Sequence, residues 1–132
     1  MDASIEVEVR PAYLHIKYPP GFVISPESSE KLWNNIGDLS RKHRRSKVLL
    51  EASAPVRELD TMSAFDSGRM IAEIMPVLTV ALCFYDYAFD ELSAFFKTVA
   101  QNRGVTIEMF TDMNEALAWL NVDTGQKTAG TS

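Results

Sequence analysis

Two apolar runs with a helical segment between them constrain the fold of this chain more than any other feature of its sequence. Residues 48–50 read Val-Leu-Leu, and residues 77–84 read Val-Leu-Thr-Val-Ala-Leu-Cys-Phe. Runs without polar alternation are typical of strands that are buried on both faces, as in a parallel sheet. The segment between them has a wide apolar face from Asp60 until Pro76, which should stop a helix. Strand, helix and strand in this order predict an α/β fold.

The remaining segments extend the same alternation. Two short alternating strands separated by Pro11-Ala12 predict an opening β-hairpin, with Leu14 and Ile16 on one face and Tyr13 and His15 on the other. The elements are expected in the order strand 5–9, strand 13–17, helix from 26 to near the basic run 41–45, strand 47–52, helix 60–75, strand 77–84, helix 90–103, strand 105–110 and helix 112–120. This β-β-α-β-α-β-α-β-α order predicts one domain with a mixed, mostly parallel five-stranded sheet and helices packed against it.

Local capping signals support several of these boundaries. Ser25 suits the N-cap of the first helix, and Pro26 suits its first position. Asp90 is a typical N-cap, Thr111 or Asp112 is expected to cap the last helix, and Gly104 is a typical C-terminal stop. Residues 1–121 are therefore predicted to form the domain, and residues 122–132, which are small and polar, to form a C-terminal tail.

Composition narrows the classes of function. The formal net charge of −5 over 132 residues argues against a nucleic-acid partner, because such proteins need a basic surface to release counterions. No apolar run reaches the length of roughly 18 residues that a transmembrane segment needs. Cys83 is the one cysteine, and the first residues lack the pattern of a targeting segment, so we expect a cytoplasmic protein.

Motifs for catalysis, cofactors and metals are missing from the sequence. His15, His43 and Cys83 have no metal-ligand spacing. Neither a phosphate-binding glycine loop nor a Gly-x-Ser-x-Gly elbow occurs. We therefore expect no metal, no cofactor and no enzymatic activity, and an enzyme that uses Glu51, Asp60 or Asp86 with Arg57 is the weakest alternative.

Polar and aromatic residues follow the central strands, where α/β proteins usually place their sites. After the strand 47–52 and its loop come Arg57, Asp60, Thr61, Met62 and Ser63, and after the strand 77–84 come Tyr85, Asp86 and Tyr87. Free N–H groups at the start of a helix favour an anion, and loop aromatics can anchor a protein partner. These residues are the predicted docking face, and the alternative is that they are ordinary loops and helix caps.

The last strand and helix carry a family resemblance. Residues 110–120 read Phe-Thr-Asp-Met-Asn-Glu-Ala-Leu-Ala-Trp-Leu, which resembles the strand, acidic cap and Glu-Ala-x-x-Trp-Leu helix that end SpoIIAA-like proteins of the STAS fold. The element order over residues 5–120 is similar to the same fold, which is related to the Sec14 lipid-binding core. The resemblance implies a non-enzymatic regulatory or protein-interaction module that docks through the start of its second helix.

In anti-sigma-factor antagonists of this fold, a serine at the start of the second helix is phosphorylated by a partner kinase. Asp66-Ser67-Gly68 is similar to the motif in letters, but the predicted helix starts earlier, at Asp60-Thr61. Thr61 or Ser63 would therefore occupy the position of the phosphosite, although the Ser-Ser-Gly letters are missing there.

A carrier for a lipid or another small apolar ligand is the alternative function. The relation to the Sec14 core and the methionines at positions 62, 70 and 75 motivate it, because methionine suits adaptable apolar surfaces. This alternative predicts a sizeable apolar pocket beside Met62, Phe65 and Met70. A homodimer is also expected, through an opening edge strand with Tyr13 and His15 facing outward.

Overall fold

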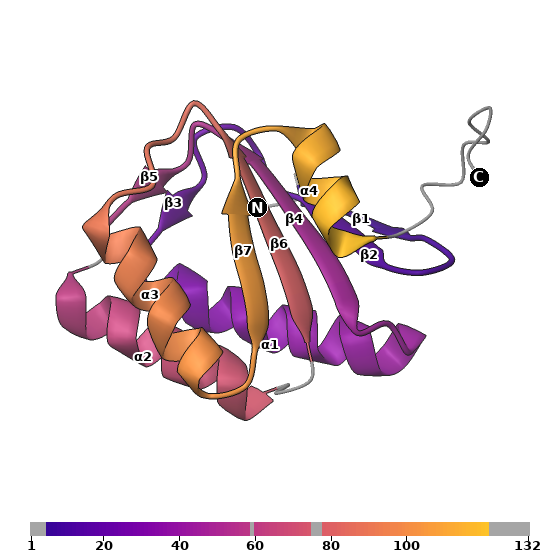
Figure 1. The fold of residues 1–132 in the computed structure, drawn as a ribbon, viewed down its shortest axis with the longest axis horizontal. Helices are drawn as coiled ribbons and strands as arrows, with labels where there is room; N and C mark the ends of the chain where they lie inside the picture. The colour runs from indigo at the N-terminus through magenta and orange to yellow at the C-terminus, as the bar shows by residue number, and fades with distance from the viewer. Residues whose placement is uncertain (1–4, 59, 75–77, 122–132) are drawn as a thin grey trace.

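A computed structural model describes residues 5–58, 60–74 and 78–121. Its main sheet has five strands in the order β1-β2-β4-β6-β7, with β1 antiparallel to β2 and the other neighbours parallel (Figure 1). The strands are β1 (Glu6–Val9), β2 (Leu14–Lys17), β4 (Lys47–Ser53), β6 (Thr79–Tyr85) and β7 (Thr106–Phe110). The predicted mixed, mostly parallel five-stranded sheet is therefore confirmed. The predicted tail, residues 122–132, lies outside the described residues.

Helices cover both faces of this sheet unequally. Helices α1 (Pro26–His43), α2 (Thr61–Ile74) and α3 (Glu91–Asn102) pack on one face, where Trp33, Ile36 and Ile71 join the larger core cluster. Among the described residues, helix α4 (Met113–Leu120) is the one helix on the other face, where it packs on Leu49, Ala81 and Cys83 (Figure 1). The burial of β4 and β6 on both faces explains why their sequences lack a polar alternation.

The predicted caps are confirmed. Ser25 N-caps α1 in a capping box, in which the Ser28 N–H donates to Ser25 Oγ at 3.1 Å and the Ser25 N–H donates to Ser28 Oγ at 2.8 Å. Asp90 and Asp112 N-cap α3 and α4. Helix α2 begins at Thr61, as the sequence indicated, and the Ser63 N–H donates to Oδ1 of Asp60 at 2.9 Å.

Replacing Ser25 with alanine is expected to lower the free energy of unfolding by about 1 kcal/mol, because the N–H of Ser28 loses its acceptor. Urea denaturation checks this value. Ser25→Asp is the matched control, since aspartate is an equally good N-cap, and it should retain most of the stability. Equal losses in both variants would contradict a capping role.

A second, two-stranded sheet was missed by the sequence analysis. Strands β3 (Val23–Ile24) and β5 (Val56–Arg57) pair in parallel, and the Val56 N–H donates to the Phe22 carbonyl at 2.9 Å. Two-residue strands are too short to show a periodic pattern, so residues 53–59 looked like an irregular loop. This small sheet holds Arg57 beside the carboxyl edge of the main sheet, where the candidate site lies.

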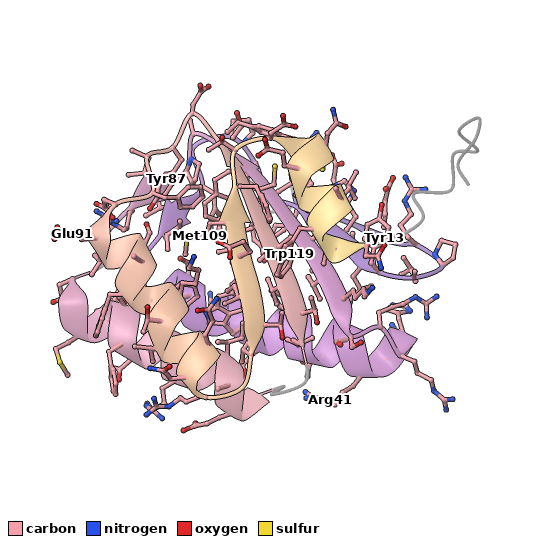
Figure 2. The ribbon with its side chains drawn as sticks, viewed as in Figure 1. Tyr13, Arg41, Tyr87, Glu91, Met109 and Trp119 are labelled. Carbon is pink, nitrogen blue, oxygen red and sulfur yellow. The ribbon has the colours of Figure 1, made fainter. Side chains whose placement is uncertain are left out.

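The predicted outward position of Tyr13 is wrong. Tyr13 is 2% exposed, because α4 returns across this face of the sheet and covers the ring (Figure 2). Strand β2 is also not an edge strand, since β1 and β4 pair with its two sides. A second copy therefore finds no free backbone on β2, and the expected homodimer itself stays a prediction.

Candidate functional site: an apolar pocket at the carboxyl edge of the sheet

An apolar pocket of about 80 Å³ lies between α1, α2, α3 and the carboxyl ends of β6 and β7. We call it the edge pocket, and Trp33, Phe84, Tyr87, Phe89, Leu92 and Phe96 supply most of its large side chains. In Figure 2, Tyr87 and Met109, which also line the pocket, are labelled near the start of α3 and along β7. The pocket therefore occupies the edge at which parallel α/β sheets usually bind their partners.

Three aromatic side chains form one wall of the edge pocket. The Phe84 ring lies 5.9 Å from Phe89 and 5.5 Å from Tyr87, and the Tyr87 and Phe89 rings lie 5.2 Å apart. Asp86 has a φ of 53° directly after β6, in the left-handed region that turns a chain sharply. This turn folds Tyr87 and Phe89 back against Phe84, so they neither extend the strand nor project into solvent as isolated anchors.

The inner end of the pocket is held by a buried hydrogen bond. The Trp33 indole Nε1–H donates to Ser67 Oγ at 2.7 Å, and the indole stacks on Phe96 with 5.9 Å between ring centroids. Ser67 belongs to the Asp66-Ser67-Gly68 segment, and its side chain is buried in the middle of α2. Its hydroxyl thus serves the packing of α1 on α2, away from the start of the helix.

The pocket opens to solvent beside an ion pair. Arg57 donates from both terminal nitrogens to the two carboxylate oxygens of Asp90, at 2.6 and 2.7 Å. Asp90 also accepts the Ser93 N–H at 3.2 Å as the N-cap of α3. The Arg57 guanidinium, together with the Ser93 N–H, holds the pKa of the Asp90 carboxyl well below its usual range. Asp90 balances the charge of Arg57 and takes two of the five N–H donors of its guanidinium.

The lowered pKa predicts how this ion pair responds to acid. A carboxyl whose pKa is lower in the folded state stabilises the fold above its unfolded pKa of about 3.9, and the contribution is lost as the pH falls below that value. Asp90→Asn keeps a good N-cap but removes the charge. Urea denaturation should therefore show Asp90→Asn to be less stable than the wild type at pH 7, with the difference shrinking at pH 3. A difference independent of pH would contradict the ion pair as its cause.

The predicted docking residues are only partly brought together. Arg57 and Tyr87 line the edge pocket. Asp60 lies in an adjoining groove with Asp90, Glu91, Leu92 and Phe95, which we call the acidic groove. In the first turns of α2, the Met62 side chain is 66% exposed and Ser63 is half-buried. The side chain of Thr61 lies outside what the structure describes, and Asp86 is exposed in the turn after β6.

Tyr85 points to the opposite face of the sheet. Its hydroxyl donates to Glu51 Oε2 at 2.9 Å, and His15 Nε2 lies 2.7 Å from Oε1 of the same carboxylate. Cys83 is fully buried beside Tyr85, and burial raises the pKa of both the thiol and the phenol. Glu51 thus pairs with His15 and Tyr85, whereas Arg57 pairs with Asp90.

Several pocket residues were missed as functional candidates. Trp33, Ser67 and Phe96 were not among the predicted docking residues, and Asp90 was predicted only as an N-cap. Arg57 and Asp90 are 33 positions apart, and nothing in their local sequence indicates that they pair. The apolar spacing of α1 and α3 indicates burial, but it does not indicate a space left unfilled.

The described residues contain no group of three His, Cys, Asp or Glu side chains arranged to hold a metal ion. Within the same ranges, no helix is long and apolar enough to cross a membrane.

Comparisons with known proteins give a structural likeness. No family model matches the sequence, and no curated protein matches it significantly. Among solved structures, the chain is similar to an uncharacterized protein of the DUF3478 family from Shewanella loihica PV-4, described as having a SpoIIAA-like fold. The two share 18% sequence identity, the match covers 88% of this chain and 91% of the other, and the TM-score is 0.49. A likeness of this size says nothing about what this chain binds or does.

Proposed function

We propose that this chain is a non-enzymatic protein-interaction module that takes one apolar side chain of a partner into the edge pocket. The observation that carries this proposal is the pocket itself, an apolar space of about 80 Å³ at the carboxyl edge of the sheet. Interfaces commonly derive much of their affinity from one anchor side chain that fills such a pocket.

The size of the edge pocket supports the interaction module over the carrier of an apolar ligand. A cavity of about 150 Å³ is needed to hold benzene, and sites for drug-sized ligands run from about 300 to 1,000 Å³. A space of about 80 Å³ suits part of one aliphatic side chain and is far too small for an acyl chain. The carrier alternative also expected its pocket beside Met62, Phe65 and Met70, none of which lines the edge pocket.

Exposed apolar side chains next to the pocket support docking of a larger surface. Met62 is 66% exposed at the start of α2, and Phe95 is 37% exposed on α3. Leu92 lines both the edge pocket and the acidic groove, so the two hollows adjoin each other. A partner that inserts one side chain into the pocket can therefore cover Phe95 with its neighbouring residues.

Phosphorylation at Ser63 or Thr61 stays a prediction within this proposal. The Ser63 N–H already donates to Asp60, which lowers the pKa of that carboxyl. A phosphate on Ser63 would therefore lie beside a carboxylate that occupies the helix start, and like charges would repel there.

Selection of peptides from an unbiased displayed library tests the proposal. We expect selected peptides to share one large aliphatic residue, and its replacement by alanine should abolish binding in isothermal titration calorimetry. Ala64→Leu adds three carbons to a buried residue that lines the pocket, so this variant should no longer bind the peptides. Ala118→Leu, on the exposed side of α4, is the matched control and should bind like the wild type.

Two other results would overturn the proposal. Peptides that bind Ala64→Leu as tightly as the wild type would place docking elsewhere. If neither variant nor wild type binds a peptide, but a small probe such as ethanol shifts the NMR signals of Ala64 and Leu92, the pocket is a site for a small molecule. Circular dichroism must show both variants to be folded before either result is read.

A further inference from the structure

We infer that the partner segment carries lysine or arginine on either side of its apolar anchor residue. This inference rests on the proposed function and adds the chemistry of the partner to it. The arrangement that supports it is a rim of carboxylates around an apolar hollow.

The charges around the edge pocket and the acidic groove are strongly unbalanced. Arg57 is the one cation among the residues that line the two hollows. Asp60, Asp90 and Glu91 line the acidic groove. In the sequence, Glu58 directly follows Arg57 and Asp86 directly precedes Tyr87, and both carboxylates are exposed. In Figure 2, Glu91 is labelled at the start of α3, to the left of and below Tyr87.

The single cation does not reverse this balance. Asp90 neutralises Arg57 through two short hydrogen bonds, so the pair contributes no net charge. Within the described ranges, the side chains of Glu58, Asp86 and Glu91 make no ion pair, and Asp60 is engaged by a backbone N–H. Four carboxylates therefore remain to attract a cationic segment.

An anionic partner would meet two obstacles at this site. It would approach the four carboxylates, and it could take the two-bond position on the Arg57 guanidinium only by displacing Asp90. Displacement would also remove the acceptor of the Ser93 N–H and uncap α3. A cationic segment needs no such rearrangement, because its charges would lie at the rim while its apolar side chain enters the pocket.

Charges at the rim of an interface act mainly on the rate of association, so their effect can be measured as a dependence of binding on salt concentration. Binding of a cationic segment should weaken steeply between about 50 and 300 mM salt, since exposed charges are screened over about 10 Å at 0.1 M. Binding through the apolar anchor alone should change little over the same range.

The test uses peptides selected by the full chain and two charge-reversal variants. The selected sequences should be enriched in lysine and arginine within three positions of the apolar anchor. Glu91→Lys should weaken their binding about tenfold at low salt and flatten the salt dependence. Glu115→Lys is the matched control, because both glutamates are exposed and lie in the first turn of a helix, and it should change binding little.

The outcomes separate this inference from the proposed function. Peptides that need their apolar anchor but show neutral flanks and no response to Glu91→Lys would overturn the cationic partner and leave the proposed function standing. Enrichment of acidic flanks would overturn it in favour of carboxylate recognition by Arg57. Failure to obtain any peptide whose binding depends on the pocket would overturn both.

Discussion

Replacing Trp33 with alanine is expected to lower the free energy of unfolding by about 3–5 kcal/mol, the largest loss we expect from any single change described for this chain. The indole is 5% exposed, stacks on Phe96 and belongs to the core beneath α1. Its removal would enlarge the edge pocket and leave the Ser67 hydroxyl without its donor. Chemical denaturation followed by circular dichroism measures the loss.

Two further variants separate packing from hydrogen bonding at this position. Trp33→Phe keeps an aromatic ring but removes the N–H, and Ser67→Ala keeps the indole but removes its acceptor. Each should cost about 1–3 kcal/mol, because each leaves a buried polar group unpaired. The double variant should cost less than the sum of the two. Met62→Ala, at an exposed position, should stay within about 0.5 kcal/mol of the wild type. Additive losses would contradict the buried hydrogen bond.

The sequence predicts the fold of this chain well because the signals involved are local. Ser25, Asp90 and Asp112 cap their helices through N–H groups two or three residues away, so capping can be recognised without knowledge of the fold. The unbroken apolar run that includes β6 indicates burial on both faces, and the structure places helices on both sides of that strand.

The candidate site is harder to predict because it depends on contacts between distant segments. Trp33 meets Ser67 across 34 positions, and Arg57 meets Asp90 across 33. The pocket is also the space that remains because the side chains of three helices do not fill the volume between them. A periodic pattern of apolar residues does not indicate such a space. Tyr13 illustrates the same limit, since its burial depends on α4, about one hundred residues further along the chain.

The second large expected effect is on stability and comes from a substitution where α2 packs closely against α3. At Gly68, an added Cβ would lie 2.9 Å from both Cβ and Cγ1 of Val99 and 3.0 Å from the carbonyl oxygen of Phe96. Alanine has a higher helix propensity than glycine, by about 1 kcal/mol, so Gly68→Ala would be stabilising if space allowed it. Contacts this short require the two helices to separate, and overpacking of a core costs about 1–3 kcal/mol.

We therefore expect Gly68→Ala to lower the stability of the protein and to loosen the edge pocket, because Ser67 and Phe96 adjoin the contact on either helix. Val99→Ala removes Cγ1, one of the three crowding atoms, so the double variant Gly68→Ala with Val99→Ala should be more stable than the sum of the single losses predicts. Thermal denaturation of the wild type, the two single variants and the double variant completes this double-mutant cycle.

A higher melting temperature for Gly68→Ala alone would mean that the higher helix propensity of alanine outweighs the close contact with Val99. Helices α2 and α3 could then separate there at little cost. In that case the wall that the two helices form would be flexible. A partner side chain larger than the 80 Å³ space could then enter the pocket by pushing α2 and α3 apart.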